Sequence, residues 1–309
     1  MVNSGKTVAA IGNFDGVHLG HLHLLEQTKA LCDELDARLG VALFDPHPQR
    51  FFQPDGPPFM LTAQHQRDGL LRAAGVEEIY SLPFDKDFAS LSPEDFVKSI
   101  LVDRLALSGV VTGVDFRFGR ARAGDVALLR QLGERFGLEV RTGKLLGRQD
   151  TDKVGSSGVR AALRAGNMRA AAEQLGRDWS VYGIVEEGQK LGRTIGFATA
   201  NMVLGSVIEP RRGVYATRTI VDGKIFNSVS NFGRRPTVGA DAPLLETHIF
   251  DFEGDLYGRP IEVEFVDFLR DEKKFDGLDP LKAQIAQDCT QALEIFKSGA
   301  GQKAGKLAQ

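Results

Sequence analysis

The sequence predicts an α/β protein of two domains: a parallel sheet covered by helices, then an antiparallel β-barrel with a closing helix. In the first half of the chain short apolar runs alternate with helical patterns, which is typical of a parallel sheet. Beyond about residue 180 short strands follow one another with glycines and without intervening helices, which favours a barrel. The length of 309 residues also exceeds that of a usual single domain.

In the first domain, strands are expected at 8–11, 38–44, 78–82 and 109–113, and helices at 21–35, 62–74, 92–105 and 125–136. The helix from 92 has the clearest start, because Ser92 is a good N-cap and Pro93 suits the first helical position. In sheets of this kind, ligands bind at the carboxyl ends of the strands. Polar, turn-rich segments follow three of these ends, so we expect the three segments to converge on one rim.

A helical stretch at 159–175 precedes the second domain. Strands are expected there at 183–187, 213–221, 224–232, 244–250 and 261–269, a closing helix at 280–296 and a frayed tail from 298. Asp222 and Gly223 form a tight hairpin signal. We set the boundary after residue 178, so that the domains are 1–178 and 179–309.

Composition and charge describe an ordinary globular protein, with 42% hydrophobic residues, 26% charged residues and a net charge of −3. This weak charge gives no electrostatic reason to expect binding to nucleic acid or to an anionic membrane. The start lacks the layout of a signal peptide, and no run is apolar enough to span a bilayer. Cys32 and Cys289 lack metal-type spacing and are expected to be buried free thiols. We therefore expect a cytoplasmic protein with small-molecule partners.

Residues 12–21, Gly-Asn-Phe-Asp-Gly-Val-His-Leu-Gly-His, lie between the first predicted strand and the first predicted helix. A glycine-rich turn before a helix start can bind phosphate, because helix-start N–H groups and the helix dipole favour an anion. His18 and His21 can donate hydrogen bonds to charge that develops on a phosphate. These residues predict nucleotide chemistry. Zinc binding by His18, His21 and His23 is an alternative, although no cysteine or acid completes a familiar ligand set.

Two further strand ends carry Phe-Asp-Pro-His-Pro at 44–48 and Asp-Phe-Arg-Phe-Gly at 115–119. With residues 12–21 they resemble, in order, motifs of the FMN adenylyltransferase module of prokaryotic bifunctional riboflavin kinase/FAD synthetases. His-Leu-Gly-His at 18–21 is similar to the HxGH motif of the nucleotidylyltransferase superfamily. The resemblance implies a Rossmann-like nucleotidylyltransferase domain that converts FMN and ATP to FAD and pyrophosphate.

The resemblance also assigns roles to residues of this first domain. As nucleotide- or flavin-binding residues it implies Gly12, Phe14, Asp15, Gly16, Asp45, His47, Asp115, Phe116 and Arg117. As catalytic residues it implies His18, His21, Ser156, Ser157 and Arg160, the last three in a helix start similar to the SSTxxR motif. One departure is Gly155, which stands where the family usually has the first serine. For Asp15 a turn cap, and for His47 a structural role in a rigid loop, are the alternatives.

Residues 183–202 open the second domain with repeated glycines around two cationic side chains, which suits a loop over polyphosphate. Residues 196–201 resemble the GFPTAN motif of riboflavin kinases, which implies Mg²⁺ binding by Thr199 and Asn201. Nucleotide-binding residues implied here are Gly188, Gly192, Arg193, Gly196 and Phe197. Ala198 occupies the position of the family's proline, so the loop loses proline's fixed φ and becomes less rigid.

The resemblance continues to the end of this domain. Glu246 occupies the position of the family's catalytic base, which accepts the proton of the ribityl hydroxyl. Arg270 is implied as a flavin-side residue, with a salt bridge as the alternative. Tyr215 and Tyr257 are expected to pack in the barrel.

Together these resemblances imply a bifunctional enzyme that phosphorylates riboflavin with ATP and then adenylylates FMN, with Mg²⁺ serving both reactions. One alternative is a tRNA synthetase-like ligase, which also uses an HxGH-type motif. It would bring a lysine-rich second signature and a basic RNA surface, and the sequence has neither. The other alternative is a flavin or nucleotide sensor that binds without turnover, suggested by Gly155 and Ala198.

Overall fold

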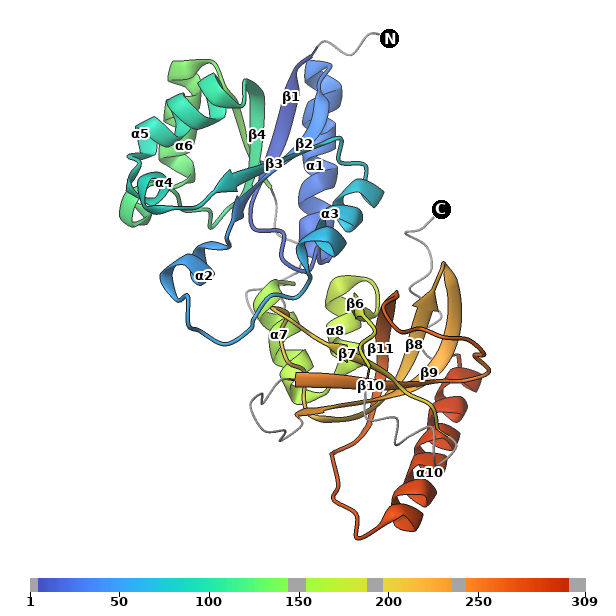
Figure 1. Ribbon diagram of the computed structural model, residues 1–309. Coiled ribbons are helices and arrows are strands. Elements are labelled where there is room, and N and C mark those ends of the chain that lie inside the picture. Colours follow the sequence, from blue (N-terminus) through green and yellow to red (C-terminus); the bar gives the residue numbers. More distant parts are fainter. Residues whose placement is uncertain (1–4, 144–153, 188–196, 235–242, 300–309) are drawn as a thin grey trace. The chain divides into compact units, whose positions relative to one another are not determined.

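The computed structural model describes residues 5–143, 154–187, 197–234 and 243–299 (Figure 1). By its internal contacts the chain divides into two compact units. The first unit comprises residues 1–56 and 67–154, and the second comprises 57–66 and 155–309. The second unit therefore includes a segment, 57–66, that lies in sequence between the two parts of the first.

The first unit is built on a five-stranded parallel sheet with the strand order β3-β2-β1-β4-β5. Its strands are β1 (Thr7–Ile11), β2 (Arg38–Asp45), β3 (Glu78–Pro83), β4 (Leu107–Gly113) and β5 (Glu139–Gly143). The predicted parallel sheet is confirmed. Strand β5 was not predicted, because only its last residue is buried and it lacks an apolar run.

Helices cover both faces of this sheet. Val8 and Ala10 of β1 belong to an apolar cluster with residues of α1 and α3, whereas Ala9 and Ile11 pack with residues of η1 and α6. Because neighbouring residues of a strand point to opposite faces, the sheet forms the middle of three layers. The helices of this part are α1 (Leu19–Leu35), α2 (Pro48–Phe52), α3 (Gln64–Ala73), α4 (Lys86–Ser90), α5 (Pro93–Asp95), the π-helical η1 (Phe96–Arg104), the short 3₁₀ turn η2 (Arg120–Arg122) and α6 (Val126–Phe136).

The helical stretch predicted at 159–175 is two helices, α7 (Ser156–Ala165) and α8 (Met168–Leu175). Gly166 ends α7 with a φ of +77°, a conformation that suits glycine. The Asn167 side chain then caps α8 by accepting a hydrogen bond from Ala170 N at 3.0 Å. Both helices pack into the core of the second unit. The predicted boundary after residue 178 lies just before the first barrel strand.

The second unit contains a six-stranded antiparallel sheet with the strand order β6-β11-β8-β9-β10-β7. Its strands are β6 (Trp179–Ile184), β7 (Ala200–Val203), β8 (Gly213–Val221), β9 (Lys224–Arg234), β10 (Pro243–Ile249) and β11 (Pro260–Arg270). A bridge between Glu186 and Asn201, in which Glu186 N donates to Asn201 O at 2.8 Å, nearly closes this sheet into the predicted barrel. The hairpin at Asp222 and Gly223 is confirmed, since both residues have positive φ.

Two strand predictions in this unit were wrong. The first barrel strand begins at Trp179, four residues earlier than predicted, because Trp179 and Val181 point into the core while Ser180 and Tyr182 do not. Strand β7 was not predicted. It has only four residues, and three of them are buried, so it has no alternating pattern to detect.

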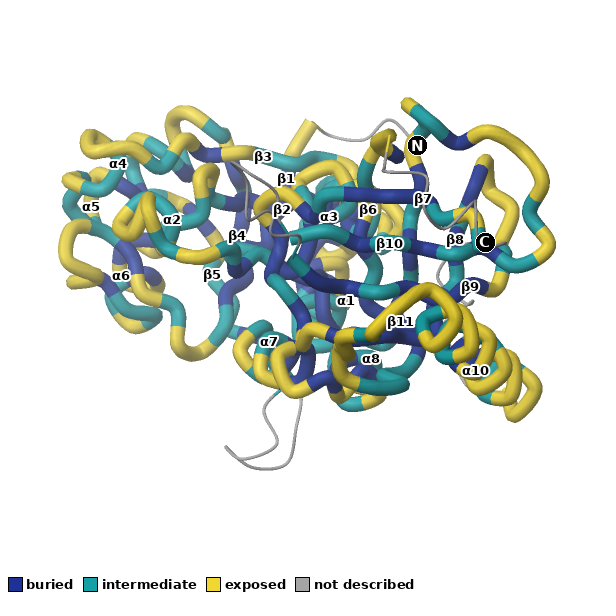
Figure 2. The backbone as a smooth tube through the Cα atoms, turned by 60° about the horizontal axis from the view of Figure 1, so that its bottom comes forward, coloured by how far each residue is buried: buried dark blue, intermediate teal, exposed yellow. Residues whose placement is uncertain are grey.

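The barrel interior combines large apolar side chains with a ladder of hydroxyl groups. Trp179, Tyr215 and Phe265 are fully buried and in ring contact, which confirms the expected packing of Tyr215. Strand β8, which carries Tyr215, is buried along most of its length (Figure 2). Beside them Thr217 Oγ1 lies 2.8 Å from the hydroxyls of both Ser228 and Ser230. The ladder continues with Thr219 Oγ1 to Ser228 and Ser230 Oγ to Thr247, each at 2.9 Å. Each buried hydroxyl of the ladder therefore has a partner.

Helix α10 (Leu278–Lys297) is the predicted closing helix, and it packs against β8 and β9 through Ala292. A bidentate ion pair also joins it to the barrel: Arg270 Nε and Nη2 lie 2.8 and 2.7 Å from the two carboxylate oxygens of Asp288. Asp288 is buried, and Gln284 Nε2 donates to the same carboxylate. No helix in the described part of the chain is long and apolar enough to cross a membrane.

Segment 57–66 is hydrogen-bonded to the barrel unit at several points. Ile208 N donates to Met60 O at 2.7 Å, and Trp179 Nε1 donates to Leu61 O at 2.8 Å. Leu61 is fully buried in the same core as Trp179. The backbone of this segment therefore satisfies buried polar groups of the second unit.

Replacing Asp288 by alanine should destabilise the second unit by about 3 kcal/mol, because the largely buried Arg270 guanidinium then loses its counter-ion. Chemical denaturation of the full chain measures this change. Glu294→Gln, an exposed change on the same helix, is the control and should stay within about 0.5 kcal/mol of the parent protein. Equal stability of the two variants would contradict the prediction.

The stability of the second unit should fall as the pH rises, because two of its carboxyl groups are at least partly buried. Burial, with Asp178 and Glu262 nearby, raises the pKa of Glu264 to about 7, and burial raises that of Asp178 to about 6 despite the Arg218 guanidinium at 3.2 Å. The unfolded chain releases these protons at lower pH. The free energy of unfolding of the second unit should therefore decrease as the pH rises from about 4.5 to about 7. In Glu264→Gln this decrease in the free energy of unfolding should be smaller by about 1–2 kcal/mol, as measured by chemical denaturation at a series of pH values across that range. Parallel pH profiles of parent and variant would contradict it.

Candidate active sites

The turn after β1 places two histidines, His18 and His21, at the start of α1. His18 is the N-cap residue, and its Nδ1 accepts a hydrogen bond from His21 N at 3.2 Å. The His18 and His21 rings stack with their centroids 3.6 Å apart, and the Phe14 ring lies 4.8 Å from that of His21. Because Nδ1 of His18 accepts, its ring proton lies on Nε2, which is then a donor.

Gly20 lies against this pair. A Cβ at this position would lie 3.1 Å from Nδ1 and Cε1 of the His18 ring and 3.2 Å from Val154 O. A side chain would therefore displace the imidazole, which gives a steric reason for glycine between the two histidines. Phe14 and Asp15 are buried in the turn. Gly16 takes a positive φ of 84° there.

Three strand ends of the first unit meet at one pocket of about 720 Å³. Gly12 follows β1, His47 follows β2, and Asp115, Phe116 and Arg117 follow β4; all five line the pocket. The predicted convergence of the three segments is therefore observed. Asp45 is exposed and is not among the lining residues. His47 also caps α2, since its Nδ1 accepts from Gln49 N at 3.1 Å, so its structural role is real.

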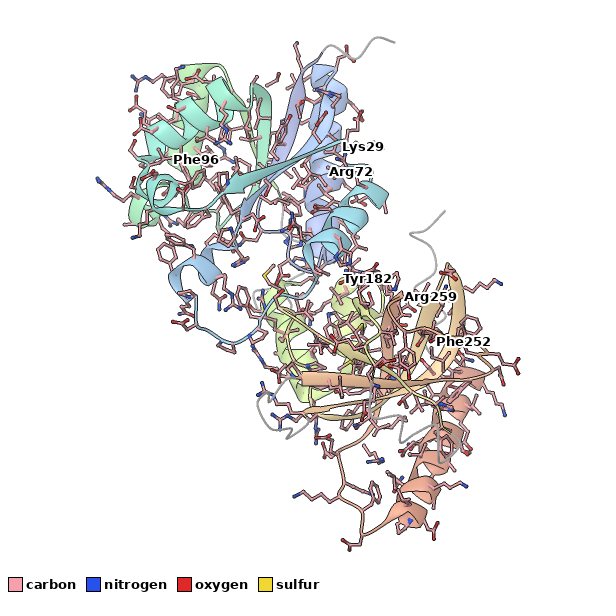
Figure 3. The ribbon with its side chains drawn as sticks, in the orientation of Figure 1. Lys29, Arg72, Phe96, Tyr182, Phe252 and Arg259 are labelled. Carbon is pink, nitrogen blue, oxygen red and sulfur yellow. The ribbon has the colours of Figure 1, made fainter. Side chains whose placement is uncertain are left out.

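The pocket is mainly aromatic, a property that the motifs indicated only in part, through Phe44, Phe116 and Phe118. Phe116 and Phe118 are stacked with their centroids 5.7 Å apart, and Phe96 of η1, labelled in Figure 3, lies 5.3 Å from Phe118. The other phenylalanines that line it are Phe44, Phe52, Phe84 and Phe88. All of these except Phe44 lie outside the motifs and on separate elements, so the only signal for them in the sequence was the number of phenylalanines, 20 in the chain. Such a lining suits a planar ring system with one polar edge.

Ser156 and Ser157 form the first turn of α7, with Arg160 on the next turn. Arg160 Nε donates to Phe59 O at 2.8 Å, and its guanidinium lies 5.4 Å from the centre of the Phe59 ring. Gly155 is the N-cap residue and has no side chain to cap the helix; the space beside it is open, so a serine would fit. All these residues belong to the second unit.

A pocket of about 900 Å³ in the second unit includes Thr199 and Asn201 among its lining residues. Asn201 is buried, and in the described part of the chain its Oδ1 has no hydrogen-bond partner. A buried amide oxygen without a donor, in a pocket that a threonine also lines, fits a hard cation that prefers oxygen ligands. Phe252, labelled in Figure 3, lines the same pocket. Tyr257 lines it as well and packs partly on the barrel core.

The register of the barrel sets Glu246 opposite Asn201, although Glu246 is not itself among the residues that line this pocket. Glu246 of β10 pairs directly with Asn201 of β7 and with Asn231 of β9. Directly opposed residues of an antiparallel pair share a face of the sheet, so the carboxylate lies on the same face as the Asn201 amide. Glu246 is partly buried between the buried Leu245 and Thr247.

Arg270 makes the ion pair with Asp288 described above, and its guanidinium lies 5.9 Å from the centre of the Phe275 ring. The salt bridge considered for Arg270 is thus present, and the flavin contact stays a prediction. Gly188, Gly192, Arg193 and Gly196 lie outside the described residues. Phe197 is described, and its ring lies edge-on to that of His248.

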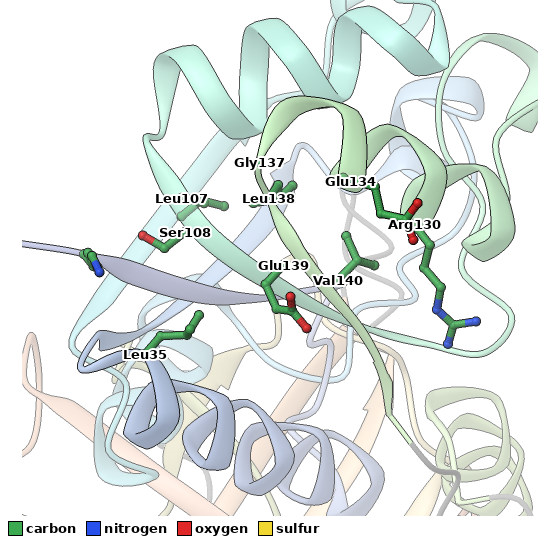
Figure 4. Close-up of a pocket in the computed structure, with 11 residues that line it drawn as sticks. Leu35, Leu107, Ser108, Arg130, Glu134, Gly137, Leu138, Glu139 and Val140 are labelled. Carbon is green, nitrogen blue, oxygen red and sulfur yellow. The ribbon is translucent and has the colours of Figure 1, made fainter.

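A further pocket of the first unit, about 650 Å³, lies at the opposite ends of the strands, beside Lys6, Leu107 and Glu139 (Figure 4). None of the predicted site residues lines it. Over the ranges that the structure describes, no group of three or more His, Cys, Asp or Glu side chains is arranged to hold a metal ion.

Two protein-family models match the chain. A family model described as FAD synthetase matches residues 2–158, and a model described as riboflavin kinase matches residues 175–296. The chain belongs to the bifunctional riboflavin kinase/FMN adenylyltransferase family. The bifunctional riboflavin kinase/FMN adenylyltransferase of Haemophilus influenzae is 38% identical over 93% of this chain and 94% of its own length. That of Bacillus subtilis is 35% identical over 95% and 93%.

A solved structure shares the fold of this family member. The crystal structure of a protein described as a macrolide-efflux protein from Streptococcus pneumoniae has a TM-score of 0.84 and 29% sequence identity, over 94% of each chain. The likeness therefore extends over both the parallel-sheet and the barrel parts of the family's fold.

Proposed function

We propose that the chain phosphorylates riboflavin at the barrel site and adenylylates FMN at the parallel-sheet site, each with ATP and Mg²⁺. The observation that carries the proposal furthest is the register that sets the Glu246 carboxylate directly opposite Asn201. Phosphoryl transfer to a hydroxyl needs a carboxylate that accepts the hydroxyl proton and nearby oxygens that hold the cation. Both are present on one face of the barrel.

In the kinase reaction, Thr199 and Asn201 would hold Mg²⁺ through their side-chain oxygens. The cation neutralises charge on the ATP phosphates when it is bound. Glu246 would take the proton of the terminal ribityl hydroxyl as that oxygen attacks the γ-phosphate, so that ADP leaves and FMN forms. Because Glu246 lies on a strand paired on both sides, its backbone is fixed before substrate binds.

In the adenylyl transfer, the FMN phosphate attacks the α-phosphate of ATP and pyrophosphate leaves. His18 Nε2–H and the His21 ring would donate to the non-bridging oxygens as charge develops there. Ser156, Ser157 and Arg160 would bind the leaving phosphates. The isoalloxazine ring fits the phenylalanine-lined pocket, with Asp115 and Arg117 near its polar edge.

We keep residues 1–178 as the adenylyltransferase segment, although α7 folds with the second unit, because Ser156 and Arg160 would serve that reaction. A cytoplasmic location is proposed from the two thiols, since Cys32 and Cys289 are both free.

The test of the adenylyl site is His21→Ala. FAD formation from FMN and ATP should fall by about 10²–10³, because one charge-stabilising donor is lost. FMN formation from riboflavin should be unchanged, as measured by chromatographic separation of the flavins. His23→Ala, whose partly exposed ring contacts Glu26 on the same helix, is the control and should leave both rates unchanged. Equal loss of both activities in His21→Ala would contradict separate sites.

The test of the kinase site is Glu246→Gln, which keeps the size of the side chain but removes the base. FMN formation should fall by about 10²–10⁴, whereas added FMN should be adenylylated at the parent rate. Glu173→Gln, an exposed change on α8, is the control. Normal riboflavin phosphorylation by Glu246→Gln would show that the carboxylate is not the base.

A further inference from the structure

His248 lies on β10, the strand of the proposed base Glu246, and contacts the backbone just before the proposed metal ligand Thr199. It lies two residues after Glu246 on β10, so it is on the same face of the strand, and it lines the 900 Å³ pocket with Thr199 and Asn201. Its Nδ1 lies 2.9 Å from Ala198 O. A carbonyl oxygen only accepts, so Nδ1 carries the ring proton and donates it to Ala198.

The His248 ring also contacts two aromatic side chains. Its centroid is 5.3 Å from that of Phe197, at an interplanar angle of 81°, and 5.7 Å from that of Phe250, at 68°. Edge-to-face contacts of this kind restrict the rotation of the imidazole. The donor is therefore held in one direction, toward the chain just before Thr199.

Strand pairing does not hold the backbone at 197–199. The pairing of β7 with β10 ends at Ala200 and Thr247, so the ladder does not include Thr199. Ala198 leaves φ at this point free, where a proline would fix it near −65°. A threonine hydroxyl that must meet a cation with a strict octahedral geometry gains from a fixed backbone.

We propose that His248 is a positioning residue of the kinase site, which holds the Ala198 carbonyl through Nδ1–H and so orients Thr199 toward Mg²⁺. The inference rests on the proposed role of Thr199 and Asn201. The histidine acts through the backbone, does not touch the reacting atoms, and performs the rigidifying task that a proline at 198 would otherwise perform.

Two substitutions separate this role from a direct contact with substrate. In His248→Asn the side-chain amide can set a nitrogen where Nδ1 was, so the bond to Ala198 O is kept. In His248→Gln the amide reaches the position of Nε2, and the bond to Ala198 O is lost. A positioning role therefore predicts that asparagine rescues and glutamine does not, whereas a substrate contact through Nε2 predicts the reverse order.

The experiment uses the full chain and three measurements. His248→Gln should raise the Mg²⁺ concentration for half-maximal FMN formation by about 10-fold, with a smaller change in kcat, and His248→Asn should stay within about 2-fold of the parent. In calorimetry without turnover, ADP with Mg²⁺ should bind His248→Gln about 10-fold more weakly. Amide hydrogen exchange at 198–201 in the ligand-free protein should be faster in His248→Gln only.

Introducing Ala198→Pro adds an internal check. The proline ring fixes φ at residue 198. In the Ala198→Pro background, His248→Gln should therefore reduce the Mg²⁺ affinity much less than it does in the parent protein. An undiminished cost in the proline background would overturn the proposal, as would equal behaviour of His248→Asn and His248→Gln or rescue by glutamine.

Thr199→Val separates this inference from the function on which it rests. If Thr199→Val leaves the Mg²⁺ dependence unchanged, the proposed metal role itself fails. If Thr199→Val weakens Mg²⁺ binding while both His248 variants bind it as the parent does, only the positioning role is overturned.

Discussion

Hydrogen-bond register between strands is the constraint on which both candidate sites depend. In the first unit, the parallel pairing of β1 with β2 and β4 brings the segments after three strands to one edge, where Gly12, His47 and Asp115 line one pocket. In the second, the antiparallel pairing of β7 with β10 sets Asn201 opposite Glu246. A slip of one residue would turn each functional side chain to the other face. The positions of the site residues therefore depend on correct strand pairing.

Buried serine and threonine hydroxyls favour the observed strand register of the barrel. The ladder that runs from Thr219 through Ser228, Thr217 and Ser230 to Thr247 crosses three strands inside the core. A buried hydroxyl without a partner is costly, and these hydroxyls meet only when the strands are paired as observed. A shifted pairing would leave several of them unsatisfied. The ladder thus works against misregistration at the strand that carries Glu246, whereas a purely apolar core would tolerate it more readily.

Much of this arrangement could be predicted from the sequence, since apolar periodicity located four of the five parallel strands and the motifs located the histidine pair, Thr199 and Glu246. Three features were not predicted. Strand β7 is too short and too buried to show alternation. The break at Gly166 was missed although the sequence carries signals for it: Met168 and Leu175 are more than a quarter of a turn out of phase with Leu163, and Gly166 and Asn167 are typical C-cap and N-cap residues. Four phenylalanines of the first pocket, Phe52, Phe84, Phe88 and Phe96, lie outside the motifs and on separate elements, so only the folded chain brings them together with Phe116.

Segment 57–66 makes the two units topologically interleaved, since the chain leaves the first unit, contributes to the second and returns. The Trp179 indole and the Leu61 carbonyl that it meets are 118 residues apart in sequence. During synthesis, Leu61 leaves the ribosome long before the barrel strands that bury it. The core of the second unit can therefore be completed only after translation has passed those strands, although one of its segments is made near the start of the chain.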